Sequence, residues 1–346
     1  MVDLLCDRQN KEKSYQGRDY RYLKLEACMQ NQNKIMSMTE AISKFVNDGD
    51  LIYLPWGNPA APAGAIHEIM RQDKRDLRLI SIANSGWVDP IFYGNQVKSI
   101  ITGWVGTELV GLAQIFRRRI QSGELQIEDY TNFHVGMMLW GGRANIPFIP
   151  VPIDRGSDIL KQKGFLGDGK YSTVKCPFTG KETVILPTFQ PDVGIVHVQR
   201  TDRQGNAQVW GTHVDFKSEI HLSCKKIIVS AEEIVDDEII AHDPDRTIIP
   251  GFKACAVVEE PWSSHPEGMY GHYDNDLAFR IFYEHSTYDD VKTKEWMDEW
   301  VYGVKDRQQY IGHYIERFGY DKLIRLKPKP FYSGSVDYSR PLPEVF

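Results

Sequence analysis

In four successive stretches of this sequence an apolar run of strand length is followed by a polar or glycine-containing loop, and in three of them a helical segment comes next. The apolar runs occupy residues 51–54, 77–82, 97–101 and 125–130. Helical segments are expected at residues 63–71, 109–121 and 135–145. Parallel strands joined by right-handed helical crossovers pack as a sheet between helices. The repeat therefore predicts an α/β fold, with an open, mostly parallel sheet and helices on both faces.

A fifth apolar run marks the middle of the chain. Residues 192–198 are rich in Val and Ile, which is typical of a buried strand, and residues 226–230 form another such run. Residues 202–206 read Asp-Arg-Gln-Gly-Asn, which favours a tight turn because Asp and Asn suit turns and Gly tolerates positive φ. This loop is either a wall of a site or an ordinary turn.

The remaining stretches divide the chain into three parts. Residues 1–35 are polar and predict an N-terminal extension, and residues 36–275 carry the α/β pattern. Their first helix is expected at residues 39–46, with Ser37 or Thr39 as its cap. Residues 153–175 are expected to form a long loop or lid. Residues 276–346 predict an aromatic-rich helical region and a proline-rich extended tail, with Trp296 and Trp300 on one helix face.

Composition limits the classes of function. The 346 residues are 42% hydrophobic and 25% charged, with a net charge of −6, which is typical of a globular protein and argues against a nucleic-acid or membrane partner. The cluster Arg117-Arg118-Arg119 is interpreted as a solvated helix face. Five scattered cysteines with no CxxC pair fit a reducing compartment. With no secretory signal or membrane-spanning run, the expected location is cytoplasmic.

Polar residues follow the predicted strands and would share one edge of the sheet, where open α/β sheets bind ligands. Each alone suits a turn or a cap, but together they mark a rim; they are Gly57, Asn58, Ser85, Glu108, Asn132 and His134.

Other constellations give weaker signals. His213 and Asp215 would lie on the same side of a strand, and His265, Glu267 and His272 cluster in one loop without a zinc spacing. The adjacent pair Glu232-Glu233 would diverge on a strand or on a helix, so joint acid–base work is not expected of it. No metal site is predicted.

Several motifs, taken in order, resemble family I coenzyme A transferases, most closely the α subunit of the glutaconate CoA-transferase branch. The resemblance runs from about Met36 to Phe318. It is carried by MTEAISKFVNDGDLIYLPWGN, IEDYTNFHVGMMLWGGRANIPFIP, CPFTG, QPDVGIVHVQRTDRQGNAQVWG, VSAEEIVD, HPEGMYGHYDND and WMDEWVYG.

The resemblance implies transfer of coenzyme A between an acyl-CoA and a carboxylic acid. In the family, a glutamate of the β subunit, within a Ser-Glu-Asn-Gly motif, attacks the thioester and becomes a glutamyl-CoA thioester. This chain lacks that motif; Ser218-Glu219-Ile220-His221 is the nearest match. The resemblance thus implies one half of a heterotetramer or larger assembly, in which the partner is a β subunit. It also implies a coenzyme A thioester as substrate and no permanently bound cofactor.

Candidate site residues follow from the same resemblance. Gly57 and Asn58 match the family's glycine-rich first loop, although Pro55-Trp56-Gly57-Asn58 departs from the Gly-Gly-Phe pattern. The other loops supply the remaining substrate-binding candidates, which are Asn84, Ser85, Gly103, Asn132 and His134.

Two rival readings remain. Related proteins of this fold hydrolyse a carbon–carbon bond of a cyclic acyl-CoA in steroid ring degradation, with an acidic residue of the α chain activating water. Glu108, at a predicted strand end, is then the catalytic candidate, and a surface carboxylate is the alternative. The third reading is a non-catalytic subunit that binds a CoA ester.

Overall fold

The computed structural model describes residues 34–56, 60–84, 86–107, 110–152, 158–211, 215 and 219–329. All the elements named below belong to one unit that begins at Lys34. The expected N-terminal extension lies outside the described residues except for Lys34 and Ile35, and the proline-rich tail lies outside them from residue 330 onward.

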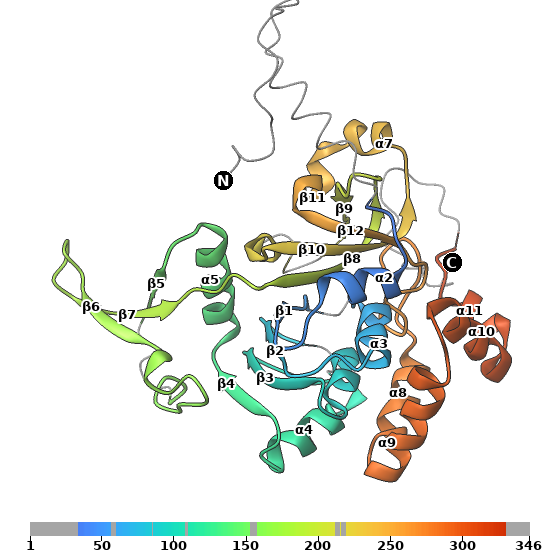
Figure 1. Cartoon of the computed structure of the whole chain (residues 1–346), viewed down its shortest axis with the longest axis horizontal. Coiled ribbons are helices and arrows are strands. Elements are labelled where there is room, and N and C mark those ends of the chain that lie inside the picture. Colours follow the sequence, from blue (N-terminus) through green and yellow to red (C-terminus); the bar gives the residue numbers. More distant parts are fainter. Residues whose placement is uncertain are drawn as a thin grey trace, which may run out of the picture. The chain divides into compact units, whose positions relative to one another are not determined.

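The centre of this unit is a mostly parallel sheet (Figure 1). Seven of its strands are parallel to their neighbours in the order β12-β10-β8-β1-β2-β3-β4. Their bounds are Leu51–Tyr53 for β1, Leu77–Ser81 for β2, Val97–Thr102 for β3, Gln126–Asp129 for β4, Val193–Thr201 for β8, Lys226–Ile234 for β10 and Ala254–Glu259 for β12. Two short antiparallel strands, β9 (Ala207–Gln208) and β11 (Thr247–Ile249), extend the sheet beside the end of β8.

Helices cover both faces of this sheet because alternate strand residues are apolar on each side. Ile52 of β1 packs into one core cluster together with α2 (Met38–Phe45), α3 (Ala63–Arg71) and the first turn of α4 (Gln114–Gln121). Tyr53, the next residue of β1, packs into a second cluster with α5 (Asn132–Arg143). The predicted fold class is confirmed.

The first helix shows how local sequence sets an element boundary. The Ser37 side chain accepts a hydrogen bond from the Glu40 N–H, and the Glu40 carboxylate accepts one from the Ser37 N–H at 2.9 Å. This reciprocal capping box satisfies two amides that the helix itself cannot bond. Ser37 is therefore the cap, as one of the two predicted alternatives.

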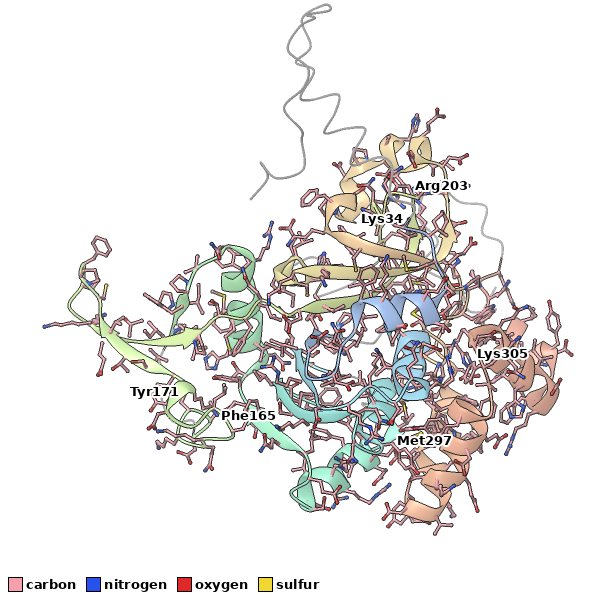
Figure 2. The ribbon with its side chains drawn as sticks, in the orientation of Figure 1. Lys34, Phe165, Tyr171, Arg203, Met297 and Lys305 are labelled. Atoms are coloured by element: carbon pink, nitrogen blue, oxygen red, sulfur yellow. The ribbon has the colours of Figure 1, made fainter. Side chains whose placement is uncertain are left out.

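The central loop 202–206 is an ordinary turn. The Asp202 carboxylate accepts hydrogen bonds from the main-chain N–H groups of Gln204 (2.9 Å) and Asn206 (2.8 Å), which closes the β8–β9 hairpin. Gly205 has φ +89°, and a Cβ there would lie 2.3 Å from the Ala254 Cβ. Lys34 donates to the carbonyl oxygen of Gln204 in this turn, at 3.1 Å. Figure 2 labels Lys34 and Arg203, the residue of the turn that precedes Gln204.

A second, antiparallel sheet replaces part of the expected long loop. Its order is β5 (Phe148–Val151), β7 (Glu182–Pro187) and β6 (Ser172–Lys175). The prediction of a loop was wrong for β6, whose four residues are all exposed and so carry no buried apolar pattern. Residues 153–157 lie outside the described part of the chain. Phe165 and Tyr171 lie on the segment that leads into β6 (Figure 2).

That segment is fastened to the main sheet by a buried ion pair. Lys170 Nζ lies 2.9 Å from Glu128 Oε1 of β4, and both side chains are fully buried. Glu128 also accepts from the N–H groups of Gly164 and Leu166, at 3.1 and 2.8 Å. The Tyr130 hydroxyl donates to the Lys170 carbonyl oxygen at 2.7 Å.

The C-terminal region is helical and aromatic, as predicted. It contains a short π-helix, Asp298–Tyr302, and four α-helices, α8 (Leu277–Ser286), α9 (Asp290–Met297), α10 (Arg307–Phe318) and α11 (Tyr320–Ile324). Trp296 and Trp300 are buried, and the Trp296 ring packs edge-on against Trp87 with centroids 5.8 Å apart. Elsewhere the described residues include α7 (Asp237–His242), which the sequence did not predict.

Arg118 joins this region to α4, so the arginine cluster is not simply a solvated face. Its guanidinium donates to the Thr287 carbonyl oxygen (2.7 Å) and the Thr293 hydroxyl (2.9 Å) and pairs with Asp290. Arg117, by contrast, is exposed. Figure 1 shows α4 beside α8 and α9.

Candidate functional site

The carboxyl ends of β1 to β4 lie along one edge of the sheet, and the segments that follow them form the strand-end rim. In the described part of the chain, the rim consists of residues 54–56, 82–84, 103–107 and 130–134. Ligands of open parallel sheets bind at this edge because the loops there vary without disturbing the strands. The rim is therefore the first place to look for a site.

Main-chain hydrogen bonds continue the pairing of β2 and β3 into the rim. The Asn84 N–H donates to the Trp104 carbonyl oxygen at 2.9 Å, and the Gly106 N–H donates to the Asn84 carbonyl oxygen at 3.1 Å. Asn84 also forms an isolated parallel bridge with Val105. These bonds hold the second and third rim segments in a fixed register.

Gly103 brings the third rim segment against the start of α5. A Cβ at this position would lie 2.5 Å from the Asn132 main-chain nitrogen and 2.2 Å from its Oδ1 atom. Only glycine permits this approach, since real Cβ contacts do not occur at such distances. Thr131 caps α5 by accepting from the His134 N–H at 3.0 Å. The structure thus brings together three of the predicted residues: Asn84 and Gly103 through their strands, and Asn132 through its helix.

His134, one turn into α5, is placed differently. Its ring is 1% exposed and lies against Tyr130 and Phe133, with centroid distances of 6.3 and 6.2 Å. Phe133 itself is 56% exposed, so the helix presents an aromatic side chain at the rim while the histidine packs inward.

The Asn84 side chain is the unusual polar group of the rim. It is fully buried, and neither its Oδ1 nor its Nδ2 has a hydrogen-bond partner within the described chain. The same holds for the hydroxyl of Thr107, which is 2% exposed. Buried polar groups are nearly always bonded, so unbonded ones at a strand end suggest groups held for a ligand or for water.

The carboxylate of Asp215, for which the sequence carries only a weak signal, lies at the end of β1. Asp215 Oδ2 accepts from the Tyr53 hydroxyl at 2.9 Å and from the Trp56 N–H at 2.7 Å. Asp215 is 3% exposed, and burial raises its pKa to about 6, although these two hydrogen bonds act in the opposite direction. His213, with which Asp215 was paired in the sequence, lies outside the described residues.

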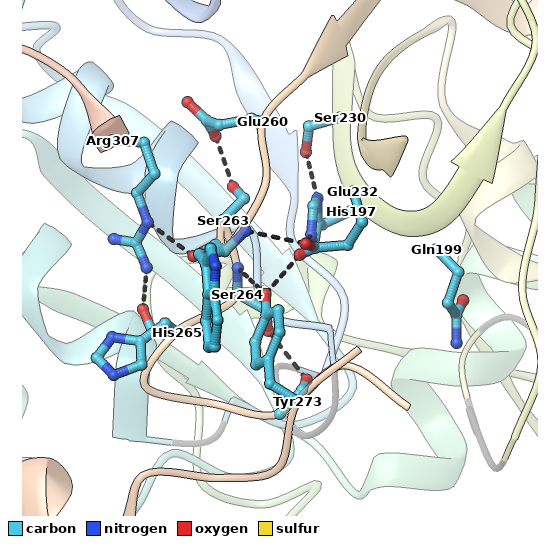
Figure 3. Close-up of polar contacts among 12 residues, drawn as sticks. His197, Gln199, Ser230, Glu232, Glu260, Ser263, Ser264, His265, Tyr273 and Arg307 are labelled. Atoms are coloured by element: carbon cyan, nitrogen blue, oxygen red, sulfur yellow. Dashed lines mark hydrogen bonds and ion pairs between the residues drawn. The ribbon is translucent and has the colours of Figure 1, made fainter. Parts of the chain in front are cut away.

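The neighbouring strands β8 and β10 carry a buried polar network (Figure 3). His197 Nδ1 lies 3.0 Å from Ser230 Oγ, and His197 Nε2 lies 2.8 Å from Glu232 Oε1. Glu232 also accepts from the Tyr273 hydroxyl (2.5 Å) and the Trp262 N–H (2.9 Å). Burial alone raises the pKa of Glu232, but the hydrogen bonds and the histidine outweigh it and hold the pKa below its usual value.

This network joins separate parts of the fold. Ser264 donates its N–H to the Tyr273 hydroxyl at 3.1 Å, and Arg307 of α10 donates to the Trp262 carbonyl oxygen at 2.8 Å. All of its side chains are buried, so it is a structural link between β10, the loop after β12 and α10. The sequence signal that reveals it is polar residues two apart on a strand, as at Ser230 and Glu232.

Several predicted residues cannot be placed. Gly57, Asn58, Ser85 and Glu108 lie outside the described part of the chain. In the loop considered for metal binding, His265 is buried beside Asp276 (3.3 Å) and Tyr310 (3.1 Å), and Glu267 pairs with Arg280. Among the described residues, no group of three or more His, Cys, Asp or Glu side chains is arranged to hold a metal ion. No described helix is both long and apolar enough to cross a bilayer.

A parallel sheet with a glycine-lined strand-end rim is a fold shared by many enzymes, and comparison with known families identifies the class. Residues 35–260 match the coenzyme A transferase family, and the chain belongs to that family. The resemblance that the motifs indicated is confirmed.

Two of the similar relatives are transferase subunits. The chain is 31% identical to the A-subunit of glutaconate CoA-transferase from Acidaminococcus fermentans, over 89% of this chain and 99% of that one. The crystal structure of that enzyme matches with a TM-score of 0.79, at 30% identity, over 88% of this chain and 98% of that one. The A-subunit of 3-oxoadipate CoA-transferase from Pseudomonas knackmussii is 29% identical, over 80% of this chain and 96% of the relative.

A hydrolase subunit is a more distant relative. The IpdA subunit of a cholesterol ring-cleaving hydrolase from Rhodococcus jostii is 23% identical, over 80% of this chain and 95% of that subunit.

Proposed function

We propose that this chain is the α subunit of a heteromeric CoA-transferase, which moves coenzyme A between an acyl-CoA and a carboxylic acid. The observation that carries the proposal is its match to nearly the whole length of the glutaconate CoA-transferase A-subunit, in sequence and in fold. The chain has no Ser-Glu-Asn-Gly motif of its own, which suits a subunit whose partner supplies the attacking glutamate.

The proposed chemistry has two covalent stages. The carboxylate of a glutamate in the β subunit first attacks the thioester carbonyl and releases the coenzyme A thiolate, which leaves an acyl-glutamyl anhydride. The thiolate then attacks the glutamyl carbonyl, releases the original acyl group as a carboxylate and forms a glutamyl-CoA thioester. The acceptor acid reverses these steps and leaves as the new acyl-CoA.

In this proposal the strand-end rim of the α subunit binds the substrate. The first N–H groups of α5, next to Gly103, have no partner within the helix and suit a developing negative charge. The buried amide of Asn84 offers both a donor and an acceptor at the same edge. We assign substrate binding to Asn84, Gly103 and Asn132, together with the loop residues Gly57, Asn58 and Ser85. His134, also a candidate from the sequence, packs inward and is assigned to holding the rim rather than to a substrate contact.

The partner supplies the decisive experiment. The chain purified alone should show no CoA transfer, whereas the complex with its β subunit should transfer. Borohydride reduction during turnover should then convert one glutamate of the β subunit to the alcohol, detected by peptide mass spectrometry. Robust transfer by the isolated chain would refute the heteromeric proposal.

Hydrolysis of a cyclic acyl-CoA is the second candidate, favoured by the similarity to the ring-cleaving hydrolase subunit. It predicts a β subunit without the nucleophilic glutamate, and it assigns water activation to Glu108. Glu108→Gln should then abolish turnover of a cyclic CoA ester, with Glu124→Gln, an exposed glutamate after α4, as the matched control. Unchanged turnover in Glu108→Gln would remove that residue from the mechanism.

A further inference from the structure

The Asp215 carboxylate uses its two oxygens unequally. Oδ2 accepts both hydrogen bonds, from the Tyr53 hydroxyl and the Trp56 N–H. Oδ1 is buried and has no hydrogen-bond partner in the chain as described. The carboxylate is therefore held rigidly by one oxygen, while the other lacks the bonds that usually stabilise a buried charge.

Trp56 gives this contact its place in the site. It is the last described residue before loop 57–59, which contains the candidates Gly57 and Asn58. Tyr53 belongs to β1 and its side chain is fully buried, so it anchors the carboxylate to the sheet. Asp215 therefore connects a rigid strand to the main chain at the start of the first rim loop.

We propose that Asp215 is a positioning residue of the acyl-CoA site: its ionised carboxylate fixes the first rim segment, residues 54–56, through the Trp56 N–H. This inference rests on the proposed function, because it assumes that the rim binds a CoA thioester. It deepens that function by assigning the position of Trp56, in the first rim segment, to a residue 159 positions away in the sequence.

The chemistry follows from the strength of the two hydrogen bonds. A charged acceptor forms bonds about twice as strong as a neutral one. Proton uptake on Oδ1 leaves Oδ2 as a neutral carbonyl oxygen, so both bonds persist but weaken. Residues 54–56 are then held less firmly, and binding of the substrate has to hold them in place, which lowers apparent affinity.

Among the described groups around Asp215, the others have pKa values far from 6, so Asp215 is the one expected to titrate near pH 6. Burial lowers the pKa of His221 to about 4, raises that of Cys224 to about 12 and raises that of Tyr53 well above its usual value. His221 also bonds the main chain of Asp215. Arg143 and Lys253 are the cations that act on His221 and help to lower its pKa.

The test follows the KM for acyl-CoA and the Kd for coenzyme A between pH 5 and 8, in the complex of this chain with its partner subunit. In the wild type, both constants should rise about five- to tenfold as the pH falls through about 6. Asp215→Asn should show the raised values at every pH, with kcat changed less than KM. Tyr53→Phe removes a hydrogen-bond donor to the charged carboxylate, so the pH at which KM and Kd begin to rise should move upward.

Asp192→Asn is the matched control, because Asp192 is also bonded to β1, through the Leu51 N–H at 3.0 Å, but at the opposite end of the strand. It should keep the wild-type profile. A wild-type pH profile in Asp215→Asn, even with a lowered melting temperature, would mean that Asp215 has only a structural role and would overturn the inference. Failure of the wild-type complex to bind coenzyme A would instead refute the proposed function, and the inference with it.

Discussion

The buried pair Glu128–Lys170 gives a sharp test of how the small sheet is attached. Lys170→Met keeps the length of the side chain and removes its charge. It leaves the Glu128 carboxylate in a fully buried position with only two main-chain donors, Gly164 and Leu166. Breaking one side of a buried ion pair costs about 3–5 kcal/mol. Because two donors remain on Glu128, we expect a loss near the lower end, about 3 kcal/mol.

Urea unfolding of the complex, or of the chain where it is stable alone, measures this loss as a shift of the midpoint. Lys161→Met is the matched control from the same segment, since its ion pair with Asp158 is exposed at 77% and 71%, and it should cost less than about 1 kcal/mol. The double variant Glu128→Gln/Lys170→Met should recover most of the loss, because no buried charge remains and the amide oxygen still accepts from Gly164 and Leu166. Equal losses in Lys170→Met and Lys161→Met would refute the reasoning.

Three further outcomes are expected. Gly103→Ala should lower kcat/KM of the complex about tenfold or more, because its Cβ would meet the Asn132 main chain at 2.5 Å; unchanged kinetics would contradict the close approach. Burial lowers the pKa of His221 to about 4, so as the pH falls from about 6.5 the unfolded state takes up a proton before the folded state does, and stability falls. Without this histidine, His221→Gln should lose about 3 kcal/mol less stability than the wild type between pH 6.5 and 4. Urea titration at each pH measures the difference. Arg118→Ala should lower the melting temperature because it removes hydrogen bonds that join α4 to the C-terminal helices, whereas the exposed Arg117→Ala should not.

Sequence predicted the parallel sheet well because its signal is local. β1 and the start of β8 are apolar and buried, whereas β2 and β3 each carry one exposed basic residue, Arg78 and Lys98, among buried ones. Strands covered on both faces are rich in Val, Ile and Leu, and this composition makes them recognisable. The family motifs then fixed the class, since their order along the chain is more specific than any one of them.

Strand ends were harder to predict because polar residues interrupt the apolar pattern there. β10 was expected to end at Ser230, yet it continues to Ile234. It continues because Ser230 and Glu232 face His197 of β8 and satisfy one another's hydrogen bonds. Here the polar residues continue the strand because they have hydrogen-bond partners on the neighbouring strand. Such partners cannot be recognised from the local sequence pattern.

The predicted start of α4 was wrong for a similar reason. Helix was expected from residue 109, but α4 begins at Gln114. Its N-cap, Ala113, makes no side-chain cap, and the Asp89 carboxylate caps the helix instead, by accepting from the N–H groups of Ile115 (3.2 Å) and Phe116 (2.8 Å). A cap supplied by a residue so far away in sequence cannot be read from the flanking residues.

The candidate site contains residues that the sequence could indicate and one that it could not. Asn84, Gly103 and Asn132 could be nominated because each directly follows a strand or begins a helix, so topology alone brings them to one edge. Asp215 could not be selected, because its role depends on Tyr53 and Trp56, more than 150 positions earlier, and on a burial that makes a carboxylate hold a proton near pH 6. The strand-end rim therefore has two kinds of residue: those placed by the repeat, and those that fix the loops from outside it. Substitutions of the second kind should alter the pH dependence of binding, whereas substitutions of the first kind should alter binding at every pH.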